Sequence, residues 1–138
     1  MRTTDDVMHA MRAQGLRVTP QRMCIVAHLV GNTTHPTVEA LYDASRVEMP
    51  TISLKTVYQT VHDLEALGEV RLVDLGTGQV RVDPNVEYSH HHLVCGGCGR
   101  VVDVPVDFDG LTLAARHRKG FHIDAVDVIF RGTCDECR

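Results

Sequence analysis

The stretch SLKTVYQTVHDLEALGEVRLVDLGTGQVRVD, residues 53–83, changes its hydrophobic period once, and this change decides the fold of the first half of the chain. Apolar residues recur every three or four positions up to residue 67, with Ser53 placed to cap a helix and Gly68 to end it. From residue 69 onward, apolar and polar residues alternate on both sides of GTG. Residues 69–83 are therefore predicted to form a β-hairpin.

Three further short helices are predicted upstream of this stretch. Thr4 or Asp5 can cap the first, Thr19 can cap a second that begins at Pro20, and Thr37 can cap a third. Helices followed by a hairpin are typical of a winged helix, whose last helix before the hairpin enters the major groove of DNA. An ordinary helical core that carries a hairpin fits the same pattern.

The second half has a different composition, and we divide the chain near residue 84. Strands are predicted at 91–95 and 100–106, a helix at 109–120 capped by Asp109, and a long alternating strand at 121–132. The sequence thus predicts an α+β protein with a winged-helix domain at 1–84 and a small α/β domain at 85–138. The second domain is too small to be stable without a metal or another cross-link.

Composition limits the possible class of protein. The chain has 138 residues, 43% of them apolar, and no apolar run long enough for a membrane span or a signal peptide, so we expect a soluble, cytoplasmic protein. The net charge of −4 is unusual for a DNA-binding protein, but no acidic residue lies between Val7 and Val38, where Arg12, Arg17 and Arg22 fall. This basic segment is compatible with DNA binding, although a solvated helix face explains it equally well.

Four of the five cysteines form two CxxC pairs, Cys95 with Cys98 and Cys134 with Cys137. Reduced thiols are expected in the cytoplasm, and four thiolates suit a closed tetrahedral Zn²⁺ site. A redox switch that loses zinc on oxidation and an iron–sulfur centre are the alternatives. The fifth, Cys24, is expected to be a buried thiol. His28 could chelate a metal with it, but core packing or solvent exposure of His28 is the favoured interpretation.

A run of three histidines precedes the first CxxC pair. Because alternate residues of a strand share a face, His90 and His92 can bind one metal while His91 points away. Asp103 could lie beside them, and Asp83 and His35 could approach from the first half. Imidazole with carboxylate suits Fe²⁺ or Mn²⁺ better than a thiolate site would.

The sequence resembles the ferric uptake regulator (Fur) superfamily over nearly its whole length. The matching motifs are LRVTPQR, HPTVEALY, ISLKTVYQTVHDLEALGEV, HHHLVCGGCGRVVD and GTCDEC, in this order. The resemblance implies a metal-dependent, homodimeric repressor of double-stranded DNA, with a C-terminal dimerisation domain and a four-cysteine zinc site. It also implies that the protein is not an enzyme.

The peroxide-sensing PerR branch of this superfamily matches best at the regulatory metal. The ligand set that the resemblance implies is His35, Asp83, His90, His92 and Asp103. Two aspartates favour PerR over iron-sensing Fur proteins, which more often carry glutamate at these two positions. The same resemblance implies oxidation of a histidine by peroxide at bound Fe²⁺, with His35 and His90 as the candidates.

Contacts with DNA are predicted mainly from the first turns of the helix at 53–67. The candidates are Arg17, Ser53, Lys55, Thr56, Tyr58 and Gln59. Many relatives have arginine in place of Gln59, so the base preference stays open.

Three other functions remain as alternatives. An iron-sensing repressor is the first. His90, His92 and Asp103 could instead form the two-histidine-one-carboxylate triad of a non-haem iron enzyme, although no substrate pocket is evident in the sequence. The third is a redox-switched zinc protein that does not bind DNA.

Overall fold

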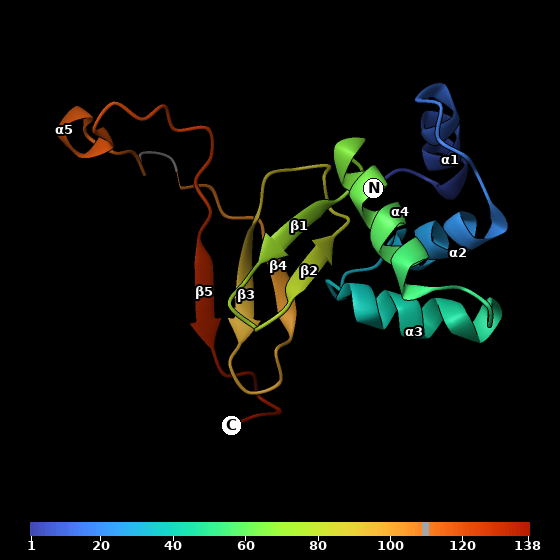
Figure 1. Ribbon diagram of the computed structural model, residues 1–138. Helices are drawn as coiled ribbons and strands as arrows, with labels where there is room; N and C mark the ends of the chain where they lie inside the picture. The colour runs from blue at the N-terminus through green and yellow to red at the C-terminus, as the bar shows by residue number, and fades with distance from the viewer. Residues whose placement is uncertain (109–110) are drawn as a thin grey trace. The chain divides into compact units, whose positions relative to one another are not determined.

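The computed structural model describes residues 1–108 and 111–138 and divides the chain into two compact units, Met1–Tyr88 and Ser89–Arg138. Helices make up most of the first unit, and a small sheet forms the centre of the second (Figure 1). No helix among the described residues is long and apolar enough to cross a membrane.

The first unit contains four helices: α1 (Thr4–Ala13), α2 (Pro20–Leu29), α3 (Val38–Glu48) and α4 (Leu54–Ala66). The side chains of Thr19, Thr37 and Ser53 accept hydrogen bonds from the first turns of α2, α3 and α4, as predicted. The cap predicted for α1 is wrong. Thr3 caps this helix because its side chain and that of Asp6 satisfy each other's backbone N–H groups.

A hairpin follows the helices, as expected for a winged helix. Strand β1 (Arg71–Asp74) pairs antiparallel with β2 (Val80–Asp83), with Leu72 opposite Val82. Val82 is buried with apolar residues from all four helices, among them Met11, Ile25 and Leu41. One hydrophobic core therefore stabilises the helices and the base of the hairpin together.

The second unit has a three-stranded sheet in the order β4–β3–β5. Strand β3 (His91–Cys95) lies between β4 (Val101–Val104), which is antiparallel to it, and β5 (Ile129–Gly132), which is parallel to it (Figure 1). The core of this unit is small: beyond residue 88, the buried hydrophobic residues in the described part are Val94, Cys95 and Val101.

Two predictions for the second unit are wrong in extent. Among the described residues of the helix predicted at 109–120, only Ala115–Arg118 (α5) are helical, and of the strand predicted at 121–132 only β5 is formed. The predicted cap, Asp109, lies outside the described residues. No residue of α5 is buried, and no side chain caps it. A helical or alternating sequence pattern does not by itself form a long helix or strand here, because the apolar face of such an element has no partner within the described chain.

Candidate metal centres and DNA-binding surface

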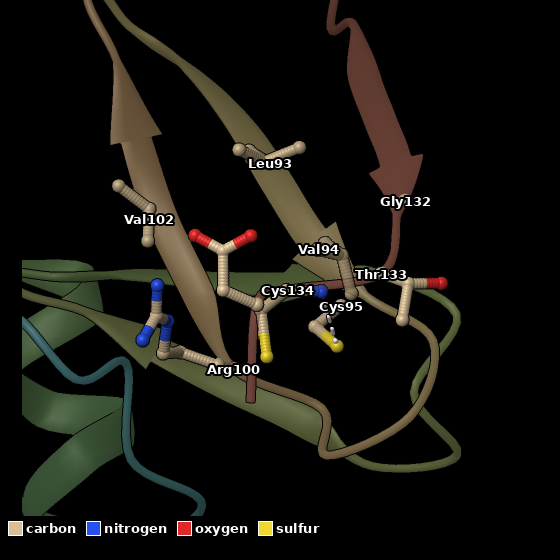
Figure 2. Close-up of a pocket in the computed structure, with 9 residues that line it drawn as sticks. Leu93, Val94, Cys95, Arg100, Val102, Gly132, Thr133 and Cys134 are labelled. Atoms are coloured by element: carbon tan, nitrogen blue, oxygen red, sulfur yellow. Dashed lines mark hydrogen bonds between the residues drawn. The ribbon is translucent and has the colours of Figure 1, made fainter. Parts of the chain in front are cut away.

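The two CxxC pairs meet where β3 and β5 end. These parallel strands pair Cys95 with Gly132, so that Cys134 lies just beyond the end of β5, near Cys95 (Figure 2). All four cysteines offer sulfur atoms within 4.8 Å of one another. Sγ of Cys98 lies 3.8 Å from Sγ of Cys134. Zn–S bonds of about 2.3 Å place the sulfurs of a tetrahedral site about 3.8 Å apart, so the geometry fits zinc.

Backbone N–H groups favour the thiolate form of Cys95. The amides of Cys134, Cys98 and Gly97 point at its sulfur and lower its pKa to about 6, and the N–H of Cys134 donates over 3.3 Å. The pKa of Cys137 moves the other way, to about 12, because hydrogen bonds to the neighbouring sulfurs favour its thiol form. Four sulfurs this close can all be thiolates only around a cation.

In the first unit, His35 and Asp83 are brought together and buried. Nδ1 of His35 lies 3.2 Å from the carbonyl oxygen of Thr33, which can only accept a hydrogen bond. In the neutral ring, Nδ1 therefore carries the proton and Nε2 the lone pair. Nε2 lies 3.7 Å from Asp83 Oδ1, a spacing that suits two ligands of one cation.

Strand β2 fixes the loop that carries His35. The backbone N–H of Val82 donates to the Pro36 carbonyl over 2.8 Å, and the Arg81 guanidinium donates to the His35 carbonyl over 3.2 Å. His35 itself has a φ of 50°, a left-handed conformation that non-glycine residues rarely adopt. Backbone strain at a residue held on both sides is typical of functional positions.

In the second unit, His90, His92 and Asp103 converge. Nε2 of His90 lies 3.4 Å from Asp103 Oδ1, and Nε2 of His92 lies 3.9 Å from the same oxygen. The strand register explains this arrangement, because His92 pairs directly with Asp103 across β3 and β4. The result is a set of two buried imidazoles and one partly buried carboxylate, donors that suit Fe²⁺ or Mn²⁺.

His91 does not join this set. Its Nδ1 accepts a hydrogen bond from the backbone N–H of Val128 over 3.1 Å, and its ring packs edge-on against Phe108. The neighbour on its face of β3, Leu93, is exposed and lies beside Val102 of β4 (Figure 2). His91 therefore anchors the segment just before β5 and does not face the candidate metal ligands.

Most of the side chains predicted to contact DNA gather beside the start of α4, whereas Tyr58 lines a different hollow together with Glu39. Arg17, Lys55, Thr56 and Gln59 line one open hollow of about 370 Å³, together with Arg22 of α2. Ser53 is the N-cap of α4, and its hydroxyl accepts from the N–H of Thr56. Arg17 and Lys55 beside the N-terminus of α4 form a surface suited to phosphate.

Two acidic residues that the sequence did not predict, Glu39 and Asp63, hold side chains that were predicted to contact DNA. The Tyr58 hydroxyl donates to Glu39 of α3 over 2.6 Å, and this bond lowers the pKa of Glu39. Gln59 donates to Asp63 over 3.0 Å, and Asp63 in turn forms a 2.7 Å ion pair with Arg22. The i,i+4 spacing of Gln59 and Asp63 could have predicted their contact from the sequence. The contacts of Tyr58 with Glu39 and of Asp63 with Arg22 join different helices, and no sequence pattern predicts them.

Comparison with known proteins gives one consistent result. The family model for the ferric uptake regulator family matches residues 13–131. The peroxide-responsive repressor PerR of Staphylococcus aureus is 30% identical over 135 residues, which cover 97% of this chain and 90% of that protein. The chain belongs to the ferric uptake regulator family.

Two solved structures support the same fold. A zinc-bound manganese uptake regulator has a TM-score of 0.74 at 27% identity, covering 96% of this chain and 99% of its own. A Campylobacter jejuni peroxide stress regulator has a TM-score of 0.62 at 27% identity, covering 99% of this chain and all of its own (100%). The predicted fold class is confirmed, and the chain is a metal-dependent DNA-binding regulator.

Proposed function

We propose that this protein is a homodimeric transcriptional repressor that releases its operator when peroxide oxidises a histidine at its regulatory metal. The observation that carries the proposal is that two kinds of metal ligand lie at separate places. The four cysteines offer only thiols, whereas His35 with Asp83, and His90 and His92 with Asp103, offer only imidazoles and carboxylates. Only the second type of donor suits a redox-active, exchangeable Fe²⁺. The similarity to PerR at 30% identity supports the same assignment.

One regulatory ion would take ligands from both units. His35 and Asp83 belong to the DNA-binding unit, and His90, His92 and Asp103 belong to the second. An ion bound to all five would restrict how the units move relative to each other. It would thereby favour the conformers whose α4 helices fit both half-sites of an operator.

The oxidation step balances with peroxide alone as the oxidant. Fe²⁺ held by His35, Asp83, His90, His92 and Asp103 would supply the redox chemistry that cleaves the O–O bond. One oxygen of H₂O₂ would insert into an imidazole C–H bond of His35 or His90 to give a C–OH group, and the other oxygen would leave as water with both peroxide hydrogens. The ring is oxidised by two electrons, and these two electrons reduce the peroxide. An oxidised imidazole is a poorer metal ligand, so the ion is lost and the units are released from each other.

The DNA contacts would come from Arg17, Ser53, Lys55, Thr56, Tyr58 and Gln59. Lys55 and Arg17 share a hollow with Gln59, which supports a combined phosphate and base-edge surface. A regulator of this kind would act where the chromosome is, in the cytoplasm.

Dimerisation would use the second unit. Leu111, Leu113 and Phe121 are more than half exposed, and Leu111 and Leu113 line a largely apolar hollow of about 550 Å³ with Ile123 and Val126. Apolar exposure on this scale in so small a unit is typical of an interface.

A mobility-shift assay with Fe²⁺ or Mn²⁺, each with and without peroxide, tests the proposal. We expect peroxide to abolish binding of the Fe²⁺ form only, and mass spectrometry to find one added oxygen on a peptide that carries His35 or His90. If the Fe²⁺ form keeps its operator and unmodified histidines, the protein is an iron-sensing repressor instead. Sustained turnover of a small molecule would favour the enzyme alternative.

A further inference from the structure

A third cluster of metal-ligating side chains lies in the first unit, apart from both centres described above. Cys24 and His28 are one helical turn apart on α2, and Glu48 is the last residue of α3. Each offers one donor atom, and the three atoms lie within 4.8 Å of one another. Two ligands at i and i+4 on one helix, completed by a carboxylate from another element, form a recurrent zinc-binding arrangement.

The contacts of His28 suit a metal ligand. Its Nε2 is shielded from solvent and makes no hydrogen bond to any described residue, although Oε1 of Glu48 lies 3.1 Å away. A nitrogen and a carboxylate oxygen at this distance without a hydrogen bond between them are placed as two ligands of one ion would be. A simple ion pair between two helices would align the N–H with the oxygen.

Cys24 completes the cluster from the protein interior. It is 7% exposed, and its Sγ lies 3.9 Å from the carbonyl oxygen of Ser45, one turn before Glu48 on α3. The Ser45 hydroxyl is fully buried and has no hydrogen-bond partner within the described residues. The Cys24 thiol therefore packs against the last turn of α3, the turn that ends in Glu48.

We propose that Cys24, His28 and Glu48 bind one Zn²⁺ ion, with water at the fourth position. Thiolate, imidazole and carboxylate are all accepted by zinc, whereas a thiolate disfavours Mg²⁺, Ca²⁺ and Mn²⁺. The ion would join α2 to α3. Arg22 of α2 pairs with Asp63 of α4, and Asp63 accepts a hydrogen bond from Gln59. By fixing α2, the ion would therefore also stabilise the position of Gln59.

Co²⁺ titration of the full-length, zinc-loaded protein tests the site, because a thiolate bound to Co²⁺ gives a charge-transfer band in the near ultraviolet. The regulatory donor set contains no sulfur, and the four cysteines already hold zinc. We therefore expect one Co²⁺ ion per chain to give this band in the wild type, at about pH 8 so that ligand protons are easily displaced. Cys24→Ser should remove the band, and His28→Ala should remove or strongly weaken it.

His62→Ala is the matched control, since His62 forms an exposed i,i+3 pair with Glu65 on α4. It should leave the band unchanged. Co²⁺ should also raise the melting temperature of the wild type more than that of His28→Ala, a variant at a partly exposed position that keeps the buried thiol. A wild type without the band, or a band that persists in Cys24→Ser through exchange into the four-cysteine site, overturns the proposal.

Discussion

Gly97 is the residue at which the four-cysteine site has no room for a side chain. A Cβ at this position would lie 2.9 Å from both Cβ and Sγ of Cys137. We predict that Gly97→Ala displaces Cys137 and destabilises the zinc-bound fold by about 1–3 kcal/mol. Release of zinc to a competing chelator, followed with a chromogenic indicator, measures the effect.

The neighbouring glycine provides the control for this prediction. A Cβ at Gly96 would meet only the carbonyl oxygen of Gly132, at an ordinary 3.7 Å. Gly96→Ala should therefore release zinc at the wild-type rate. Equal rates of zinc release from Gly97→Ala and Gly96→Ala would show that contact with Cys137 does not weaken zinc binding.

The three consecutive histidines should respond differently to replacement by alanine. His90→Ala and His92→Ala each remove an imidazole that faces Asp103, so we predict that both abolish metal-dependent DNA binding. His91→Ala removes packing against Phe108 and should lower stability but preserve binding. Mobility shifts across a Mn²⁺ titration measure this, with zinc content as the control. Loss of DNA binding in all three variants would contradict the assignment of His91 to the opposite face from His90 and His92.

At the scale of elements, α4 and the segment before α2 should contribute to DNA binding in different ways. Arg17→Ala removes a cation from the hollow beside α4, so we predict weaker binding to all sequences and a smaller salt dependence. Gln59→Ala should relax the preference at particular base pairs by about 1–3 kcal/mol. Binding isotherms on an operator and on random DNA, at several salt concentrations, distinguish the two. Equal losses on both DNAs for Gln59→Ala would exclude base readout.

At the scale of the whole molecule, the two units should depend on zinc to different degrees. The first unit has a core of residues from all four helices, whereas the second has few buried apolar side chains. We predict that Cys95→Ser unfolds the second unit and abolishes dimerisation, while the helices of the first unit remain. Hydrogen exchange measured by unit tests this prediction. A zinc-free variant that stays folded and dimeric would refute it.

Dimerisation itself should depend on the exposed apolar residues of the second unit. Phe121 is 74% exposed. We predict that Phe121→Asp shifts the protein to monomer, because burying a carboxylate without a partner at an interface is costly. Light scattering during size-exclusion chromatography reports the mass. Val47→Asp, which changes an 80% exposed residue of α3, should leave the dimer intact, and an unchanged mass for Phe121→Asp would exclude this surface.

Local sequence determined the elements whose signals lie within a few residues. Thr19 with Pro20, Thr37 and Ser53 mark the starts of three helices, and the alternation around GTG marks the hairpin, because capping and strand period are short-range properties. The order of the sequence motifs likewise indicated the family. Alternation along the strand predicted that His91 points away from the face that His90 and His92 share. The predictions of a helix and a long strand over 109–132 were wrong in extent, because such elements need a surface on which to bury their apolar faces and local sequence does not reveal whether one exists.

Only the tertiary structure decided which distant residues meet. The parallel pairing of β3 with β5 brings one CxxC pair to the other, and Val82 bonded to Pro36 places His35 beside Asp83. The contacts of Tyr58 with Glu39, and of Cys24 and His28 with Glu48, join residues on different helices. Spacing along a chain gives no information about such contacts, because helix packing and strand order, rather than sequence separation, set the distance between side chains.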